Sequence, residues 1–179
     1  MSGIHKTSML LLALLILVPL QFGCALYQFG NEAVFPQNIR TVHVPVVRND
    51  TFRHDLGVRL TEALVKEIER RTPFKVTGDP NADSTLRCHL VDATKTVVSE
   101  SESDDPRALS ASLVAKATWV NRTGQMLMNN RVSPSVDPAI AFGQDTRFVP
   151  EAGQSIDTAN QRVIEDLAER IVSQMEIRW

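Results

Sequence analysis

The stretch from Ile39 to Val76, IRTVHVPVVRNDTFRHDLGVRLTEALVKEIERRTPFKV, decides the fold of this chain. Its first part, Thr41 to Val47, alternates in character, and alternation with a period of two residues is typical of a half-buried strand. Pro45 cannot donate a hydrogen bond to a sheet, so an edge or an irregularity is expected there. The side chains predicted to share the apolar face of this strand are Val42, Val44 and Val46.

From His54 to Arg71 the period changes to that of a helix. Leu56, Leu60 and Leu64 recur on one stripe, while charged residues lie off it, so the segment predicts an amphipathic helix that ends before Pro73. Phe74 to Thr77 then predicts a short strand.

The middle of the chain predicts two long strands. Thr85 to Val98 alternates cleanly until its phase slips near Asp92, where a bulge accounts for the shift. Ala108 to Val120 resumes the alternation. Asn121 to Gly124 is typical of a hairpin loop, leading into a further strand from Gln125 to Val132.

The last part predicts a long loop and a helix. Ser133 to Pro150 has no firm period, and Ser155 to Glu176 has one apolar stripe with Ser155 as its N-cap. The fold class expected is α+β, a two-layer sandwich with one mixed sheet of four to five strands and two helices on one face. The opposite sheet face is expected to carry Thr41, His43, Arg87, His89, Lys116 and Thr118.

An export signal precedes this domain. A weakly basic start is followed by an apolar run, Met9 to Leu20, which is shorter than the roughly 20 residues of a transmembrane helix. Small Gly23 stands before Cys24, which favours cleavage after residue 23 and acylation of Cys24; a plain secretory signal cut after Ala25 is the alternative. Ala25 is not the aspartate that retains lipoproteins at the inner membrane, so the outer membrane is favoured.

The remaining 24–179 are expected to be a tether, 24–37, and one domain, 38–179. Hydrophobic residues make up 43% and charged residues 22% of the chain, which suits a globular domain with its own core. The formal net charge of −2 gives no basic excess of the kind that nucleic-acid binding needs.

No residue pattern indicates catalysis, a resident metal or a cofactor. The metalloprotease, paired-cysteine, phosphate-loop and serine-hydrolase motifs are missing from the sequence, so an enzyme is not expected. His43 and His89 are more simply solvent-facing side chains than metal ligands. Cys88 alternates with Leu86 and Leu90 and is expected in the core.

The run from Ile39 to Val76, the segment NADSTL (Asn81 to Leu86) and the closing segment PEAGQSIDTANQRVIEDLAERIVSQME (Pro150 to Glu176) resemble the LptE family of lipopolysaccharide-assembly lipoproteins. The resemblance implies an α/β sandwich seated in the lumen of the outer-membrane β-barrel LptD. There it would plug the barrel, support its assembly and assist lipopolysaccharide on its way to the outer leaflet. Family members use basic residues on lipopolysaccharide phosphates, and the strand cations that could do so here are Arg87, Lys116 and Arg131.

A second interpretation comes from a different class. Periplasmic lipoproteins of the LpoB or CsgG kind, which regulate a cell-wall synthase or form a secretion component, also place a similar strand before an amphipathic helix. The segment from Val42 to Thr51 does not separate the two interpretations. A secreted hydrolase is a third class, for which the sequence offers no site.

Overall fold

A computed structural model of the chain describes residues 35–100, 106–128 and 139–176. All of these belong to one compact unit, Val34–Trp179. The predicted signal, Cys24 and Arg131 lie outside the described residues.

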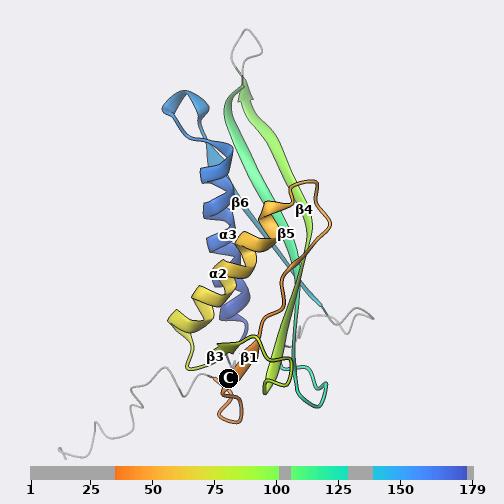
Figure 1. Ribbon diagram of the computed structural model, residues 1–179. Coiled ribbons are helices and arrows are strands. Elements are labelled where there is room, and N and C mark those ends of the chain that lie inside the picture. The colour runs from red at the N-terminus through yellow and green to blue at the C-terminus, as the bar shows by residue number, and fades with distance from the viewer. Residues whose placement is uncertain (1–34, 101–105, 129–138, 177–179) are drawn as a thin grey trace, which may run out of the picture. The chain divides into compact units, whose positions relative to one another are not determined.

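Six strands form a single mixed sheet, with the order β3-β1-β4-β5-β6 and β2 paired to β4 beside that path. β1 lies parallel to both β3 and β4, whereas β4, β5 and β6 are antiparallel neighbours. The predicted mixed sheet is therefore confirmed, with six strands among the described residues in place of the expected four to five (Figure 1). The strands are β1 Thr41–His43, β2 Arg48–Asn49, β3 Lys75–Thr77, β4 Ser84–Glu100, β5 Pro106–Asn121 and β6 Ile140–Phe148.

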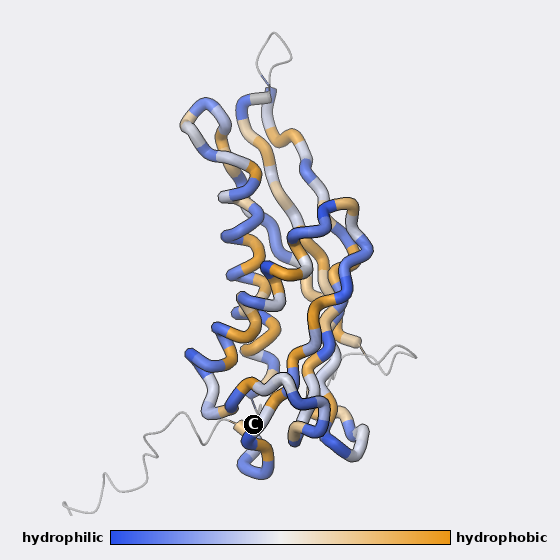
Figure 2. The backbone as a smooth tube through the Cα atoms, viewed as in Figure 1, coloured by the Kyte–Doolittle hydropathy of each residue, from blue (hydrophilic) through white to orange (hydrophobic). Residues whose placement is uncertain are grey.

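Two long helices, α2 (Asp55–Arg71) and α3 (Ile156–Ser173), pack on one face of the sheet, and a short 3-10 helix, η3 (Pro150–Ala152), leads into α3 (Figure 1). Hydrophobic segments recur once per turn along both helices (Figure 2). The buried residues of α2 form its predicted stripe, and α3 buries a similar one; the fully buried members include Leu56, Leu60, Leu64, Ile68, Val163, Ile164, Leu167 and Ile171. Both helix predictions are confirmed.

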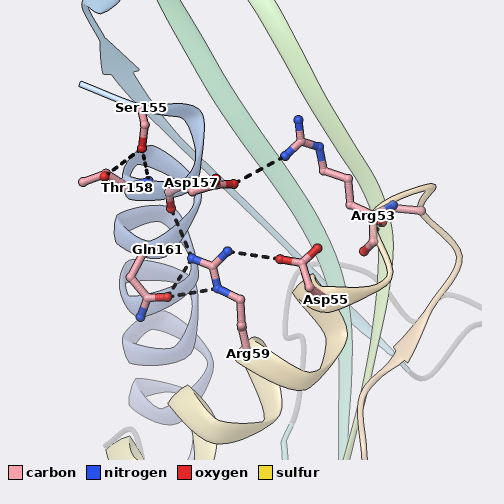
Figure 3. Close-up of polar contacts among 8 residues, drawn as sticks. Arg53, Asp55, Arg59, Ser155, Asp157, Thr158 and Gln161 are labelled. Atoms are coloured by element: carbon pink, nitrogen blue, oxygen red, sulfur yellow. Dashed lines mark hydrogen bonds and ion pairs between the residues drawn. The ribbon is translucent and has the colours of Figure 1, made fainter. Parts of the chain in front are cut away.

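Polar contacts fasten the two helices near their N-terminal ends (Figure 3). The guanidinium of Arg59 donates to Gln161 Oε1 at 2.8 and 3.1 Å and to the carbonyl oxygen of Asp157 at 3.1 Å. The predicted N-cap is confirmed, because the hydroxyl oxygen of Ser155 accepts a hydrogen bond from the backbone N–H of Thr158 at 3.1 Å. Because the Arg59 guanidinium is charged, its hydrogen bonds to Gln161 and Asp157 stabilise the contact between α2 and α3 more than bonds between neutral groups would.

The central strands supply the other half of the core. On β5 every second side chain is buried against the helices, and several are alanines, which leaves room for α3 to lie close. The phase slip in β4 is confirmed as a register shift between Leu90 and Asp92. Phe35, which was predicted to lie in the tether, is buried, with its ring 5.5 Å from that of Phe74.

Asp83 ties the start of β1 to the start of β4. Its carboxylate accepts hydrogen bonds from the backbone N–H groups of Arg40 and Thr41 at 3.1 and 3.0 Å and from the Thr41 hydroxyl at 2.9 Å. The Arg40 N–H makes the largest contribution, and together these donors hold the pKa of Asp83 below its usual value.

The prediction of a long loop from Ser133 to Pro150 is wrong over the described part of that segment. Residues Ile140–Phe148 form strand β6, which pairs with β5 from Ala117↔Ile140 to Leu109↔Phe148. Phe142, which lies within that segment, is only 6% exposed. Polar residues and Gly143 interrupt the alternation in the middle of this segment, so its period is not visible in the sequence. Pairing with β5 and packing under α3, rather than local propensity, hold the segment extended.

Two smaller predictions also fail. Regular pairing of the first strand ends at His43, and the phase shifts at Pro45, so Val46 is 73% exposed and Val47 is buried. The irregularity expected at Pro45 is confirmed, but the shared face of Val46 with Val42 is not. The predicted strand from Gln125 is reduced, within its described part, to one isolated bridge between Met126 and Val120.

Gly57 marks a close approach between α2 and the segment that carries β2. A Cβ atom there would lie 3.0 Å from Asn49 Cβ and 3.0 Å from the Val47 carbonyl oxygen. Neither neighbour can yield easily, since one is backbone and the other side chain is held by hydrogen bonds. We expect Gly57→Ala to lower the free energy of unfolding by about 1–2 kcal/mol, because the overpacking cost exceeds the gain of about 1 kcal/mol in helix propensity.

Urea unfolding of the domain, residues 38–179, measures this effect. Gly78→Ala is the matched control, since a Cβ there meets nothing within 4 Å. Equal unfolding midpoints for the two variants would show that α2 does not approach β2 this closely.

Candidate functional site

The sheet face that the helices leave open carries the candidate site. Leu86 and Leu90 on β4 are buried on the helix side, so the alternating Arg87 and His89 face the other way. The antiparallel register sets Arg87 opposite Thr118 and His89 opposite Lys116, which places Arg87 and Lys116 on a diagonal of the same face. The expected polar face is therefore present.

A pocket of about 470 Å³ opens on this face, and we name it the cationic pocket. It combines three basic side chains with apolar ones. Its lining residues are Pro45, Val46, Arg48, Arg87, Cys88, His89, Lys116, Thr118 and Ala139.

Two of the three basic residues predicted to meet phosphate, Arg87 and Lys116, line this one pocket. Arg87 is exposed and makes no hydrogen bond or ion pair within the described residues, so its guanidinium can bind a ligand without breaking an existing contact. Sequence reasoning missed Arg48, which β2 places beside His89 of β4. β2 has only two residues, which is too short to show a period, and it forms only through its parallel pairing with β4.

Asp50 fixes the rim of the pocket. Its carboxylate lies 2.6 Å from His89 Nε2 and 3.1 Å from Arg48 Nε. Desolvation acts to raise the pKa of Asp50, but the hydrogen bonds and charges of Arg48 and His89 outweigh it, so the pKa is lowered. Asp50 therefore remains an anion at neutral pH and holds both neighbouring side chains in place.

The two strand histidines do not form a metal site. His43 is opposite Thr85 on β4, whereas His89 lies further along that strand, and the ring of His43 contacts the Thr77 carbonyl oxygen at 3.1 Å. Across 35–100, 106–128 and 139–176, no cluster of three or more metal-ligating side chains occurs.

Cys88 is buried, as predicted, and burial raises the pKa of its thiol to about 12. A thiol that stays protonated at neutral pH is a poor nucleophile. The basic side chains that line the pocket lie beside apolar ones, a combination that suits an anionic amphiphile.

A mixed sheet with two helices on one face defines this chain as a small α+β sandwich domain. The family model described as LptE, lipopolysaccharide-assembly, matches residues 39–175, so the chain belongs to the LptE family, a non-enzymatic lipoprotein family. No curated protein matches the chain.

Solved structures share its fold at low sequence identity. The PelC dodecamer from Paraburkholderia phytofirmans is 11% identical, with a TM-score of 0.50 over 82% of this chain and 93% of that one. A protein from Xanthomonas campestris is 9% identical, with a TM-score of 0.50 over 77% of this chain and 84% of its own. In the described part of the chain, no helix is both long and apolar enough to cross a membrane.

Proposed function

We propose that this lipoprotein sits in the lumen of an LptD-type outer-membrane β-barrel, supports assembly of the barrel and assists the passage of lipopolysaccharide. The observation that carries the proposal is the cationic pocket on an open polar sheet face, in a chain of the lipopolysaccharide-assembly family. The interior of a wide barrel is polar and wet, which suits a sheet face of threonine, arginine, histidine and lysine.

The pocket would meet the phosphate groups of the glycolipid. Arginine binds phosphate through paired, charge-assisted hydrogen bonds, and Arg87 has its donors available for this. Val46 and Ala139 add apolar surface beside the cations, where the first methylenes of an acyl chain could lie.

In this proposal, Cys24 carries the lipid that anchors the protein. Acylation there would hold the domain on the periplasmic side of the outer membrane, with residues 24–37 as the tether. Because one acyl chain alone binds a bilayer only marginally, the several chains of a bacterial lipoprotein are what make the attachment durable.

Co-purification tests the proposal directly. The full-length lipoprotein, extracted in mild detergent, should recover a large outer-membrane barrel in a one-to-one ratio, and its depletion should lower both assembled barrel and surface lipopolysaccharide. A peptidoglycan synthase as the main partner, or a homo-oligomeric ring, would contradict it and favour the regulator interpretation.

Arg87→Glu should weaken lipopolysaccharide binding about 10- to 150-fold, since the loss of a charge-assisted bond to phosphate costs about 1.5–3 kcal/mol. The domain should stay folded, because the Arg87 side chain is exposed and makes no hydrogen bond or ion pair within the described fold. Capture of radiolabelled lipopolysaccharide by the purified full-length lipoprotein measures the change.

Arg147→Glu is the matched control, because Arg147 is an exposed cation on β6, opposite Ser110 and well away from the pocket along β5. Equal losses in the two variants would show that general charge, and not the cationic pocket, attracts the glycolipid.

A further inference from the structure

Strand β4 is paired on both sides over only its first half. β5 accompanies it along its length, while on the other side β1 pairs with Ser84 and Thr85, and β2 pairs with His89 and Leu90. The last bond on that side joins the backbone N–H of Asp50 to the Leu90 carbonyl oxygen at 3.0 Å. Beyond it, no strand of the described chain pairs with β4, which runs on with β5 as a long hairpin (Figure 1).

The unpaired side contains a regular run, Asp92–Val97, which we name the β4 edge. Its register with β5 is continuous from Asp92↔Val114 to Val97↔Leu109, and shifts lie just before and just after it. Five of its six residues are exposed, and Ala93 is half-buried. A free edge presents backbone donors and acceptors in the spacing of a strand, which makes it a template for another strand.

The exposed aromatic side chain of Phe52 lies close to the beginning of the β4 edge. Phe52 is fully exposed, at 102% of its reference area. Hydrogen bonds hold the loop around it: Asn49 Oδ1 accepts from the Thr51 N–H at 2.9 Å and from the Thr51 hydroxyl at 2.7 Å, and Asn49 Nδ2 donates to the Arg53 carbonyl oxygen at 2.6 Å.

Phe52 and the beginning of the β4 edge border one pocket of about 260 Å³. Its lining also includes Val91, Asp92 and Ala93. A fixed loop that leaves a whole phenylalanine in water forgoes the stabilisation of burying that ring, which a partner would supply.

We propose that the β4 edge and Phe52 bind an extended segment of the barrel partner by strand addition. The inference rests on the proposed function, because it takes the barrel as the source of the segment. The segment pairs with β4 on the same side as β2, beginning where β2 pairing ends at Asp50. It donates and accepts backbone hydrogen bonds along Asp92–Val97, and it packs one apolar side chain against Phe52. Its remaining side chains are mostly uncharged, since the edge offers only Asp92 and Lys95 as charged partners.

A crosslinking ladder tests strand addition. Photo-crosslinking amino acids are placed at Thr94 and at Thr96 of the full-length lipoprotein in living cells, and the captured barrel residues are identified by mass spectrometry. Both positions are exposed and lie on one face of β4, so moving the probe by two residues should move the captured site by two residues. A probe at Phe52 should capture the adjoining end of the same segment, and a probe at exposed Arg162 on α3 should not capture that segment.

A substitution adds an independent measurement. Phe52→Ser should leave the melting temperature unchanged, because the ring is fully exposed, and should reduce barrel recovery several-fold. Val58→Ser, at an exposed valine of α2, is the matched control and should leave recovery unchanged.

Other outcomes overturn the inference. Capture of a second copy of this chain, capture at scattered barrel positions, or no capture from a complex that still co-purifies would each reject strand addition and leave the proposed function standing. If the barrel does not co-purify with the unmodified lipoprotein, the proposed function fails, and the inference fails with it.

Discussion

Leu64→Asp is expected to unfold the domain. Leu64 lies in the middle of the buried stripe of α2 and is 0% exposed. The substitution removes a packed side chain and puts an unpaired carboxylate in its place, at a cost of about 5 kcal/mol. Since domains of this size are stable by only about 5–15 kcal/mol, the loss takes a large share of the total.

Val58→Asp is the matched control on the same helix. Val58 is 52% exposed and lies in the first turn of α2, where a negative charge is stabilised by the helix dipole. Thermal unfolding followed by circular dichroism should give a native melting temperature for Val58→Asp and little or no folded protein for Leu64→Asp. Equal melting temperatures would mean that the faces of α2 are assigned wrongly.

Cys24→Ala should release the protein from the membrane. Each buried methylene of an acyl chain contributes about 0.8 kcal/mol, so the loss of all chains removes the predicted attachment. In cells without the barrel partner, fractionation should move the protein from the outer-membrane pellet to the soluble periplasmic fraction.

Cys88→Ala is the cysteine control, because Cys88 is buried in the core and its replacement leaves Cys24 for acylation. That variant should remain in the pellet. If Cys24→Ala still pellets after a high-salt wash in the absence of the barrel, acylation of Cys24 is not the anchor.

Periodicity predicts those parts of the fold in which one face of an element is buried throughout. The helical period of α2 and the alternation in the first half of β4 are both regular, so the type of each element and the bulge after Leu90 were predictable. β6 was not, because it owes its extended form to pairing with β5, and its Gly143 and polar residues conceal the two buried phenylalanines, Phe142 and Phe148.

The cationic pocket was likewise predictable only in part. Period-two alternation alone puts Arg87 and Lys116 on one face, and the antiparallel register then brings them to one pocket. Arg48 and Phe52 escaped prediction, because their positions depend on where β2 leaves β4 and on the Asn49 hydrogen bonds in the following loop. Such contacts between distant segments leave no periodic trace in a sequence.

The proposed function requires the open sheet face to lie against a barrel wall. Photo-crosslinking amino acids at Arg87 and Thr118 test it most directly, with Leu167 of α3 as the control position, because its side chain is fully buried in the core. We predict that both sheet positions capture a large outer-membrane barrel in living cells and that Leu167 captures none. Capture of a peptidoglycan synthase or of a second copy at the sheet positions, with no barrel at either, would contradict the account.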